Sequence, residues 1–187
     1  MEWFDKNAAA IIAASAALIA SLIAGTFALL GAYLNHWFSN KRYEEQKLHD
    51  AAKDNKRLYL EKGEELHSLI TQWGNTAYAD MMGGRNVIAG IFTKVQHRDF
   101  VKENFDPAIY MRLKSLMDIY FNHLWEHFNK VREIPTNAPD ITEAYERGSL
   151  SQIDALNKHD FYCKDFDHLL AAVQEELQKI LLEQLKN

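Results

Sequence analysis

The longest apolar run lies near the N-terminus, where residues 8–34 contain no Asp, Glu, Lys or Arg. A helix needs about 20 apolar residues to cross roughly 30 Å of hydrocarbon. Three polar residues interrupt the run, and their hydroxyls can bond to carbonyls of the preceding turn: Ser15, Ser21 and Thr26. Amphipathic aromatics, which favour the headgroup level, stand before the run and at or after its end: Trp3, Phe4, Tyr33, Trp37 and Phe38. The pattern predicts a transmembrane helix over residues 8–34.

Two other structures compete for this run. A secretory signal has a positively charged start and an apolar core of about 7–15 residues, whereas this chain starts MEWFDK and its run is longer. Small residues in ASA and AGT could still mimic a cleavage site. A buried, alanine-rich helix of a soluble protein is the second alternative. We expect a spanning anchor.

The basic residues beside the run predict its orientation. Lys6 stands alone on the N-terminal side, and four cations follow on the C-terminal side: Lys41, Arg42, Lys47 and Lys53. Because cytoplasmic flanks carry the excess of Lys and Arg, residues 1–7 should form a short extracytoplasmic tail. Residues 41–187 should then lie in the cytoplasm.

Small residues recur every fourth position inside the run, at Ala9, Ala13, Ala17, Ser21 and Gly25. Small faces let helix backbones approach closely in lipid, where packing drives association. The row predicts self-association or pairing with a partner's membrane helix. The alternative is that an alanine-rich helix produces such rows by chance.

The charged segment after the anchor, residues 35–57, is expected to be a solvated helical stalk, or alternatively a flexible linker. From residue 58 onward, apolar residues recur at helical spacing, first at Leu66, Leu69, Ile70, Trp73 and Ala77. We expect the first break at Gly83-Gly84. A short helix should follow over residues 85–98.

Two longer helices are predicted further along. Asp106 can cap a helix that has Pro107 in its first turn and runs for about 27 residues, until two prolines in PTNAPD break it. Ser151 with Asp154 resembles a cap for the last helix. That helix has a seam with steps of three and four: Leu156, His159, Cys163, Phe166, Leu170, Val173, Leu177 and Ile180. The predicted fold is all-α, with an antiparallel cytoplasmic helical bundle over residues 58–187.

One constellation suggests metal chemistry. His123 and His127 are four residues apart, as are His159 and Cys163. If the two helices pack antiparallel, the pairs lie at similar height and offer four ligands for tetrahedral zinc. The alternative is that these are core and surface residues that share a level. HLWEH, residues 123–127, also matches a short inverted zinc-peptidase string, but no third ligand is evident.

Composition limits the remaining functions. The net charge is −5 and no segment is strongly basic, which excludes a dedicated nucleic-acid binder. No phosphate loop, dinucleotide-binding glycine motif or nucleophile elbow occurs. We therefore expect no enzyme and no cofactor other than the possible zinc. The single cysteine excludes an internal disulfide.

YLEKGEELHSLITQWGN and, further on, RLKSLMDIYFNHLWEHFNKV resemble segments of uncharacterised bacterial single-pass membrane proteins with a helical cytoplasmic domain. The resemblance implies an inner-membrane setting and no catalytic residues. The expected function is a membrane-anchored interaction module whose partners are the bilayer and either a second copy or another protein. The alternatives are an oligomerising membrane effector of a stress or phage-defence system, and a metal-bearing bundle.

Overall fold

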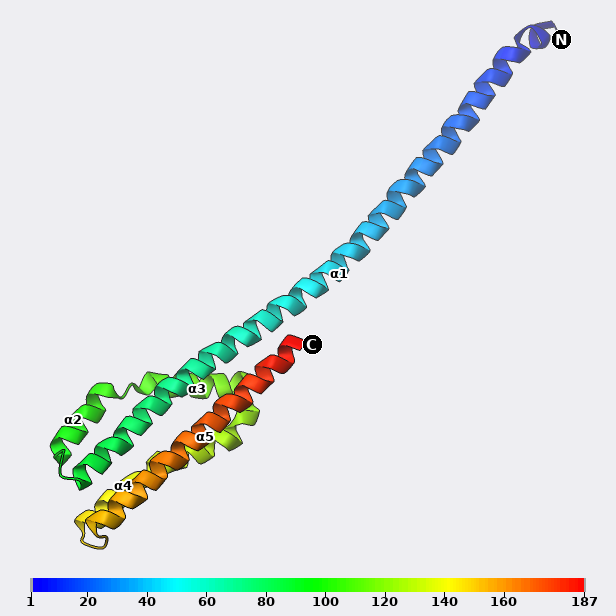
Figure 1. The fold of residues 1–187 in the computed structure, drawn as a ribbon. Helices are drawn as coiled ribbons and strands as arrows, with labels where there is room; N and C mark the ends of the chain where they lie inside the picture. Colours follow the sequence, from blue (N-terminus) through cyan, green and yellow to red (C-terminus); the bar gives the residue numbers. More distant parts are fainter. Residues whose placement is uncertain (1, 187) are drawn as a thin grey trace. The chain divides into compact units, whose positions relative to one another are not determined.

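A computed structural model describes residues 2–186, and all of its regular elements are helical (Figure 1). In chain order they are α1 (Glu2–Ile88), α2 (Lys94–Asn104), α3 (Pro107–Tyr120), the 3₁₀ turn η1 (Asn122–Leu124), α4 (Trp125–Glu146) and α5 (Gln152–Lys186). No strand occurs in the described range, so the all-α prediction is confirmed. Met1, part of the predicted tail, lies outside the described residues.

The chain divides into two compact units, residues 1–54 and 55–187. In the first unit, residues 8–34 are helical and exposed throughout. The hydroxyls of Ser15, Ser21 and Thr26 donate to Ile11, Leu18 and Ile23 carbonyls, each at 2.8 Å. The predicted back-bonding is thus confirmed. The segment is long and apolar enough to span a membrane.

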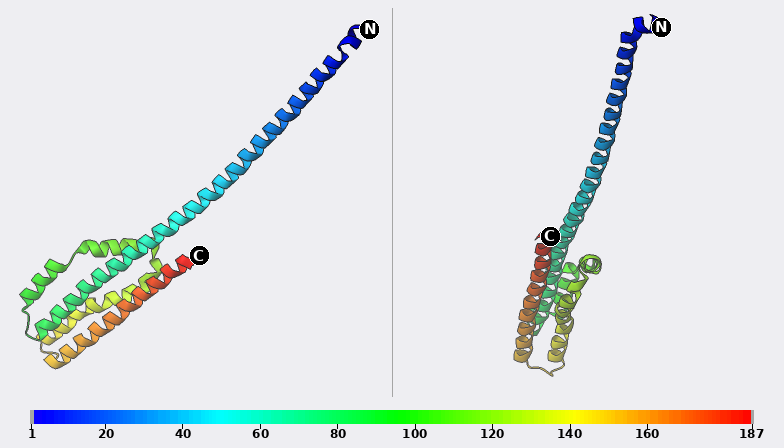
Figure 2. Two further views of the ribbon diagram at one scale, coloured as in Figure 1. Left: turned by 45° about the horizontal axis from the view of Figure 1, so that its top comes forward. Right: turned by 90° about the vertical axis from the view of Figure 1, so that its right-hand side faces the viewer.

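The second unit surrounds one main apolar core. Aromatic rings meet at its centre, where the Trp73 ring lies 4.8 Å from that of Phe128 and 5.9 Å from that of Phe166. The part of α1 from residue 55 on supplies one side of this core, and α4 and α5 lie side by side along it (Figure 2). Other buried members include Leu66, Ile70, Leu113, Met117, Phe121, Leu124, Val131, Val173 and Leu177.

Glycines mark the closest approaches between α1 and its neighbours. The predicted break at Gly83-Gly84 is wrong, because α1 continues to Ile88 with both glycines buried. A β-carbon on Gly83 would lie 2.6 Å from His97 Nε2, and one on Gly63 would lie 2.8 Å from Leu181 Cδ1. These glycines therefore permit close packing rather than ending the helix. The turn comes later, where Gly90 has φ of 73°.

The predicted proline break is also wrong. Pro135 and Pro139 lie inside α4, although each removes a helix hydrogen bond at a cost of about 3 kcal/mol. The helix persists because it buries a continuous apolar stripe against the core: Phe128, Val131, Ile134, Ala138 and Ile141. Burial of about 1.5–3 kcal/mol for each large side chain offsets the loss.

The single long helix expected from Pro107 is divided in two. Asp106 Oδ1 caps α3 by accepting from Ala108 N at 2.8 Å, as predicted. The helix ends at Tyr120, and Phe121 leaves helical geometry with φ −134° and ψ 40°. This turn buries both Phe121 and Leu124 completely, so core packing overrides the local helical pattern.

The last helix matches its prediction most closely. Ser151 Oγ accepts from Asp154 N at 3.2 Å and donates to the Asp154 carboxylate at 2.6 Å, which forms the predicted cap. Every residue of the predicted seam from Leu156 to Ile180 is buried or partly buried. The helix extends to Lys186, beyond the point where the strict seam stops.

Candidate functional site, a pocket beneath helix α2

Helix α2 begins at Lys94, four residues after the turn at Gly90, and Thr93 is its N-terminal cap. Thr93 and Gln96 form a capping box, in which Thr93 Oγ1 accepts from Gln96 N at 3.2 Å and Gln96 Oε1 accepts from Thr93 N at 2.8 Å. The short helix predicted over residues 85–98 is therefore wrong in position. Residues 89–93 are a turn and α2 covers Lys94–Asn104.

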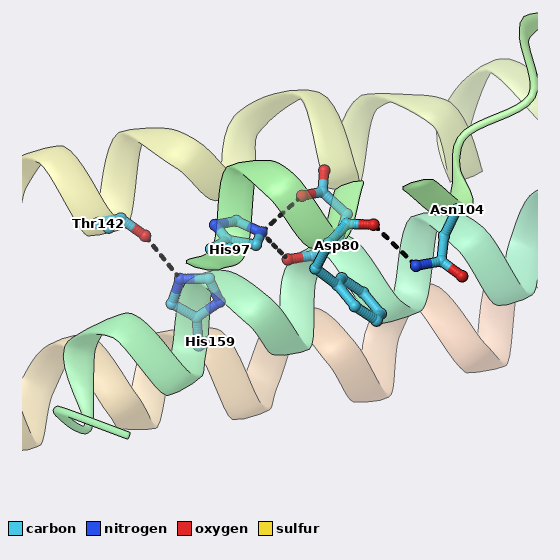
Figure 3. Close-up of polar contacts among 6 residues, drawn as sticks. Asp80, His97, Asn104, Thr142 and His159 are labelled. Atoms are coloured by element: carbon cyan, nitrogen blue, oxygen red, sulfur yellow. Dashed lines mark hydrogen bonds and ion pairs between the residues drawn. The ribbon is translucent and has the colours of Figure 1, made fainter. Parts of the chain in front are cut away.

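Polar contacts attach α2 to its neighbours. His97 Nε2 lies 2.9 Å from Asp80 Oδ1 and 3.0 Å from the Asp80 carbonyl oxygen (Figure 3). Lys94 Nζ pairs with Glu146 of α4 at 2.7 Å. No residue of α2 is fully buried. The helix thus lies over the unit without a large apolar anchor of its own.

A pocket of about 730 Å³ lies beneath α2. Residues of α1, α2 and α4, together with His159 of α5, line it. A smaller pocket of about 220 Å³ shares Asp80, Val101 and Pro135 with it, so the two pockets are neighbours along α2. The main pocket is within the range typical of small-molecule sites, about 300–1,000 Å³.

His159 is the one buried polar or charged residue in the described chain, with 1% of its surface exposed. Its Nε2 lies 3.3 Å from Thr142 Oγ1 (Figure 3), and its Nδ1 has no hydrogen-bond partner. Burial lowers the pKa of this imidazole, because the charged form loses hydration. The ring is therefore held neutral at the inner wall of the pocket.

Gly84 lies against the hydrogen-bonded residues His159 and Thr142. A β-carbon there would be 3.4 Å from Thr142 Oγ1 and 3.5 Å from His159 Cε1, which is ordinary van der Waals contact. The adjacent Gly83 instead supports the His97 ring at much closer range. The two neighbouring glycines of α1 thus face the two histidines from different elements, but only Gly83 requires the absence of a side chain.

The four residues proposed for zinc do not form one site. His123 in η1 and His127 in α4 are exposed, while His159 and Cys163 are buried in α5. Among the described residues, no group of three or more His, Cys, Asp or Glu side chains could hold a metal. The buried positions of this region are Leu124, Phe128 and Val131, so His123 and His127 lie at the surface and not on the face that packs against α5.

Cys163 belongs to the core instead. Its Sγ lies 3.9 Å from Met82 Sδ, and burial raises the pKa of the thiol. A thiol with a raised pKa is mostly protonated at neutral pH and reacts slowly. Its seam position therefore has a packing role.

The small row Ala9, Ala13, Ala17, Ser21 and Gly25 lies on an exposed part of α1. A β-carbon added at Gly25 would meet nothing within 4 Å. This face is open to a second helix, and self-association through it stays a prediction.

No sequence pattern predicted the pocket. The Thr93…Gln96 spacing is a capping-box signature that could have located the start of α2. The cavity itself depends on how far α2 lies from α1 and α4, and no local pattern encodes that distance.

No family model matches this sequence, and no curated protein or solved structure shows significant similarity to it.

Proposed function

We propose that the chain is a single-pass membrane-anchored interaction module of the bacterial inner membrane. Residues 8–34 span the bilayer, with a short extracytoplasmic tail before them and a cytoplasmic antiparallel helical bundle after them. The bundle binds a protein partner at the cytoplasmic face. The small-residue face of the anchor brings copies of the chain together.

One observation carries the proposal. The most apolar window of α1 has none of its residues buried within the protein. The core helix of a soluble protein would bury such a window, because leaving it in water costs about 25 cal/mol per Å² of apolar surface. Hydrocarbon is the environment that removes this cost.

Fractionation tests the anchor. We expect the full chain to stay with membranes through both high-salt and alkaline carbonate washes. Replacing Leu18 and Leu22 with Arg should release a large share, because Arg at the centre of a spanning helix costs about 2.5–3.5 kcal/mol. The control replaces the exposed Leu182 and Leu185 of α5 in the same way. Release of the wild-type chain by carbonate would contradict the proposal.

A membrane-helix association reporter tests the small face. Replacing Ala17 and Gly25 with Leu should weaken the signal, because bulk on that face separates the backbones. The control replaces Ser15 and Thr26 with Leu, which adds the same number of leucines outside the row. If both pairs leave the signal unchanged, the row reflects composition alone.

Crosslinking in membranes followed by affinity purification then identifies partners of the helical unit.

A further inference from the structure

The pocket beneath α2 has a mostly apolar wall. Met81 and Val87 of α1 line it with Val95 and Val101 of α2, and Ala138 lies between the two prolines of α4 on the other side. Apolar lining with a few placed polar groups is typical of small-molecule sites. The body of a ligand that fits here is therefore apolar.

Helix α2 places three positively charged residues at the edge of this pocket. Lys94, Arg98 and Lys102 are spaced four apart, and all three line the pocket. The acids Asp99 and Glu103 of the same helix do not line it, and all five charged side chains are exposed. With about 100° per residue, the centres of the two charge sets are about 120° apart around the helix. The cations therefore border the pocket and also reach water, which suits the charged head of a ligand whose body lies inside.

Two of these three cations lack a strong partner. Lys94 pairs with Glu146 at 2.7 Å. Arg98 contacts only the adjacent Asp99, at 3.6 Å, and Lys102 makes no ion pair with any residue of the described chain. Each of the three acids that line the pocket has a partner: Asp80 bonds His97, Glu146 pairs with Lys94, and Glu143 lies 4.0 Å from Arg147. Arg98 and Lys102 therefore remain available to an anionic group.

We propose that this pocket binds a single-chain anionic amphiphile, with its hydrocarbon chain along Met81, Val87 and Ala138 and its anionic head between Arg98 and Lys102. A carboxylate or phosphate head satisfies both cations by charge-assisted hydrogen bonds. His159 stays neutral at the inner wall and adds no second charge. The inference goes beyond the proposed function, because it requires the pocket and not the membrane span.

The test uses the full chain in nanodiscs of neutral phosphatidylcholine. A diazirine-bearing hexadecanoic acid and a diazirine-bearing lysophosphatidic acid serve as photoreactive probes, and the matching hexadecanol serves as the uncharged comparison. After irradiation, mass spectrometry locates the labelled residues. We expect anionic probes to label peptides covering residues 80–102 and 135–146. The stronger of the two identifies the head group.

Two variants separate charge from volume. Replacing Arg98 and Lys102 with Glu should reduce anionic labelling about tenfold or more, and Ala138→Leu should reduce labelling by filling the apolar wall. The control replaces Lys114 and Lys179 with Glu, because these exposed cations lie outside the pocket. Circular dichroism melts confirm that each variant folds. Equal labelling by the acid and the alcohol, labelling elsewhere only, or unchanged labelling of the Arg98/Lys102 variant would overturn the proposal.

Discussion

Large apolar side chains are exposed in the first unit of this protein, whereas many of those in the second are buried. Leu18, Leu22 and Leu29 of the first unit are exposed, whereas Leu66, Leu113 and Leu177 of the second are completely buried. Both sets lie on α-helices, and each residue belongs to an apolar pattern with helical spacing. The difference shows that helical periodicity alone does not determine what covers an apolar face. The distribution of charged residues distinguishes the two cases. Residues 8–34 contain no charged residue, whereas charged and apolar residues alternate in the second unit.

Truncation of a core side chain should give the largest difference in stability between the two units. Phe128→Ala should lower the free energy of unfolding of the helical unit by about 3–5 kcal/mol, because a fully buried ring leaves a cavity. Leu22→Ala, in the exposed segment, should leave it unchanged. Urea denaturation of both variants, monitored by circular dichroism in mild detergent, measures the difference. Similar losses would mean that residues 8–34 belong to the same core.

Substitutions of glycine should give a smaller difference in stability between the two units. Gly74→Ala should destabilise the helical unit by about 1–3 kcal/mol, because the new methyl group would collide with Leu170 of α5. Gly25→Ala meets nothing within 4 Å and should leave this stability as it is. Thermal melts of the two variants decide it. A stable Gly74→Ala protein would show that α1 and α5 are packed less closely than described.

The adjacent glycines at the pocket form a second matched pair. Gly83→Ala should displace the His97 ring and increase hydrogen exchange across residues 94–104, because the contacts with Asp80 hold α2. Gly84→Ala should be neutral or stabilising by up to about 1 kcal/mol, since alanine favours helix and meets only ordinary contacts. Exchange measured by mass spectrometry tests this. Equal protection of α2 in both variants would contradict its attachment through His97.

The smallest expected effect concerns pH. Burial lowers the pKa of His159, so below about pH 6.5 the unfolded chain binds a proton that the folded chain does not. Its contribution to stability is complete above that pH and is lost as the pH falls. The decline between pH 7.5 and 5 should be shallower in His159→Gln than in the control His168→Gln, which alters an exposed histidine of the same helix. Parallel pH profiles would contradict the buried, neutral imidazole.

Local patterns predicted the parts of this fold that depend on neighbours in sequence. The Asp106 and Ser151 caps and the α5 seam are of this kind, because capping and helical periodicity act within a few residues. Pro139 inside α4 and the turn at Phe121 were missed, since tertiary packing overrides the local preference there. The pocket depends both on local sequence and on tertiary packing. The cations of α2 are visible in the sequence, but their common direction toward α1 and α4 is a property of the packed unit.

Accessibility of single cysteines tests the proposed membrane topology most directly. Glu2→Cys and Gln184→Cys, each made in a Cys163→Ser background, place one thiol near either end of the chain. Spheroplasts are treated with a membrane-impermeant maleimide, before and after permeabilisation. We expect that the thiol at position 2 reacts in intact spheroplasts and that the thiol at position 184 reacts only after permeabilisation. Reaction of both in intact spheroplasts, or recovery of the chain in the soluble fraction, would contradict a single span with a cytoplasmic helical unit.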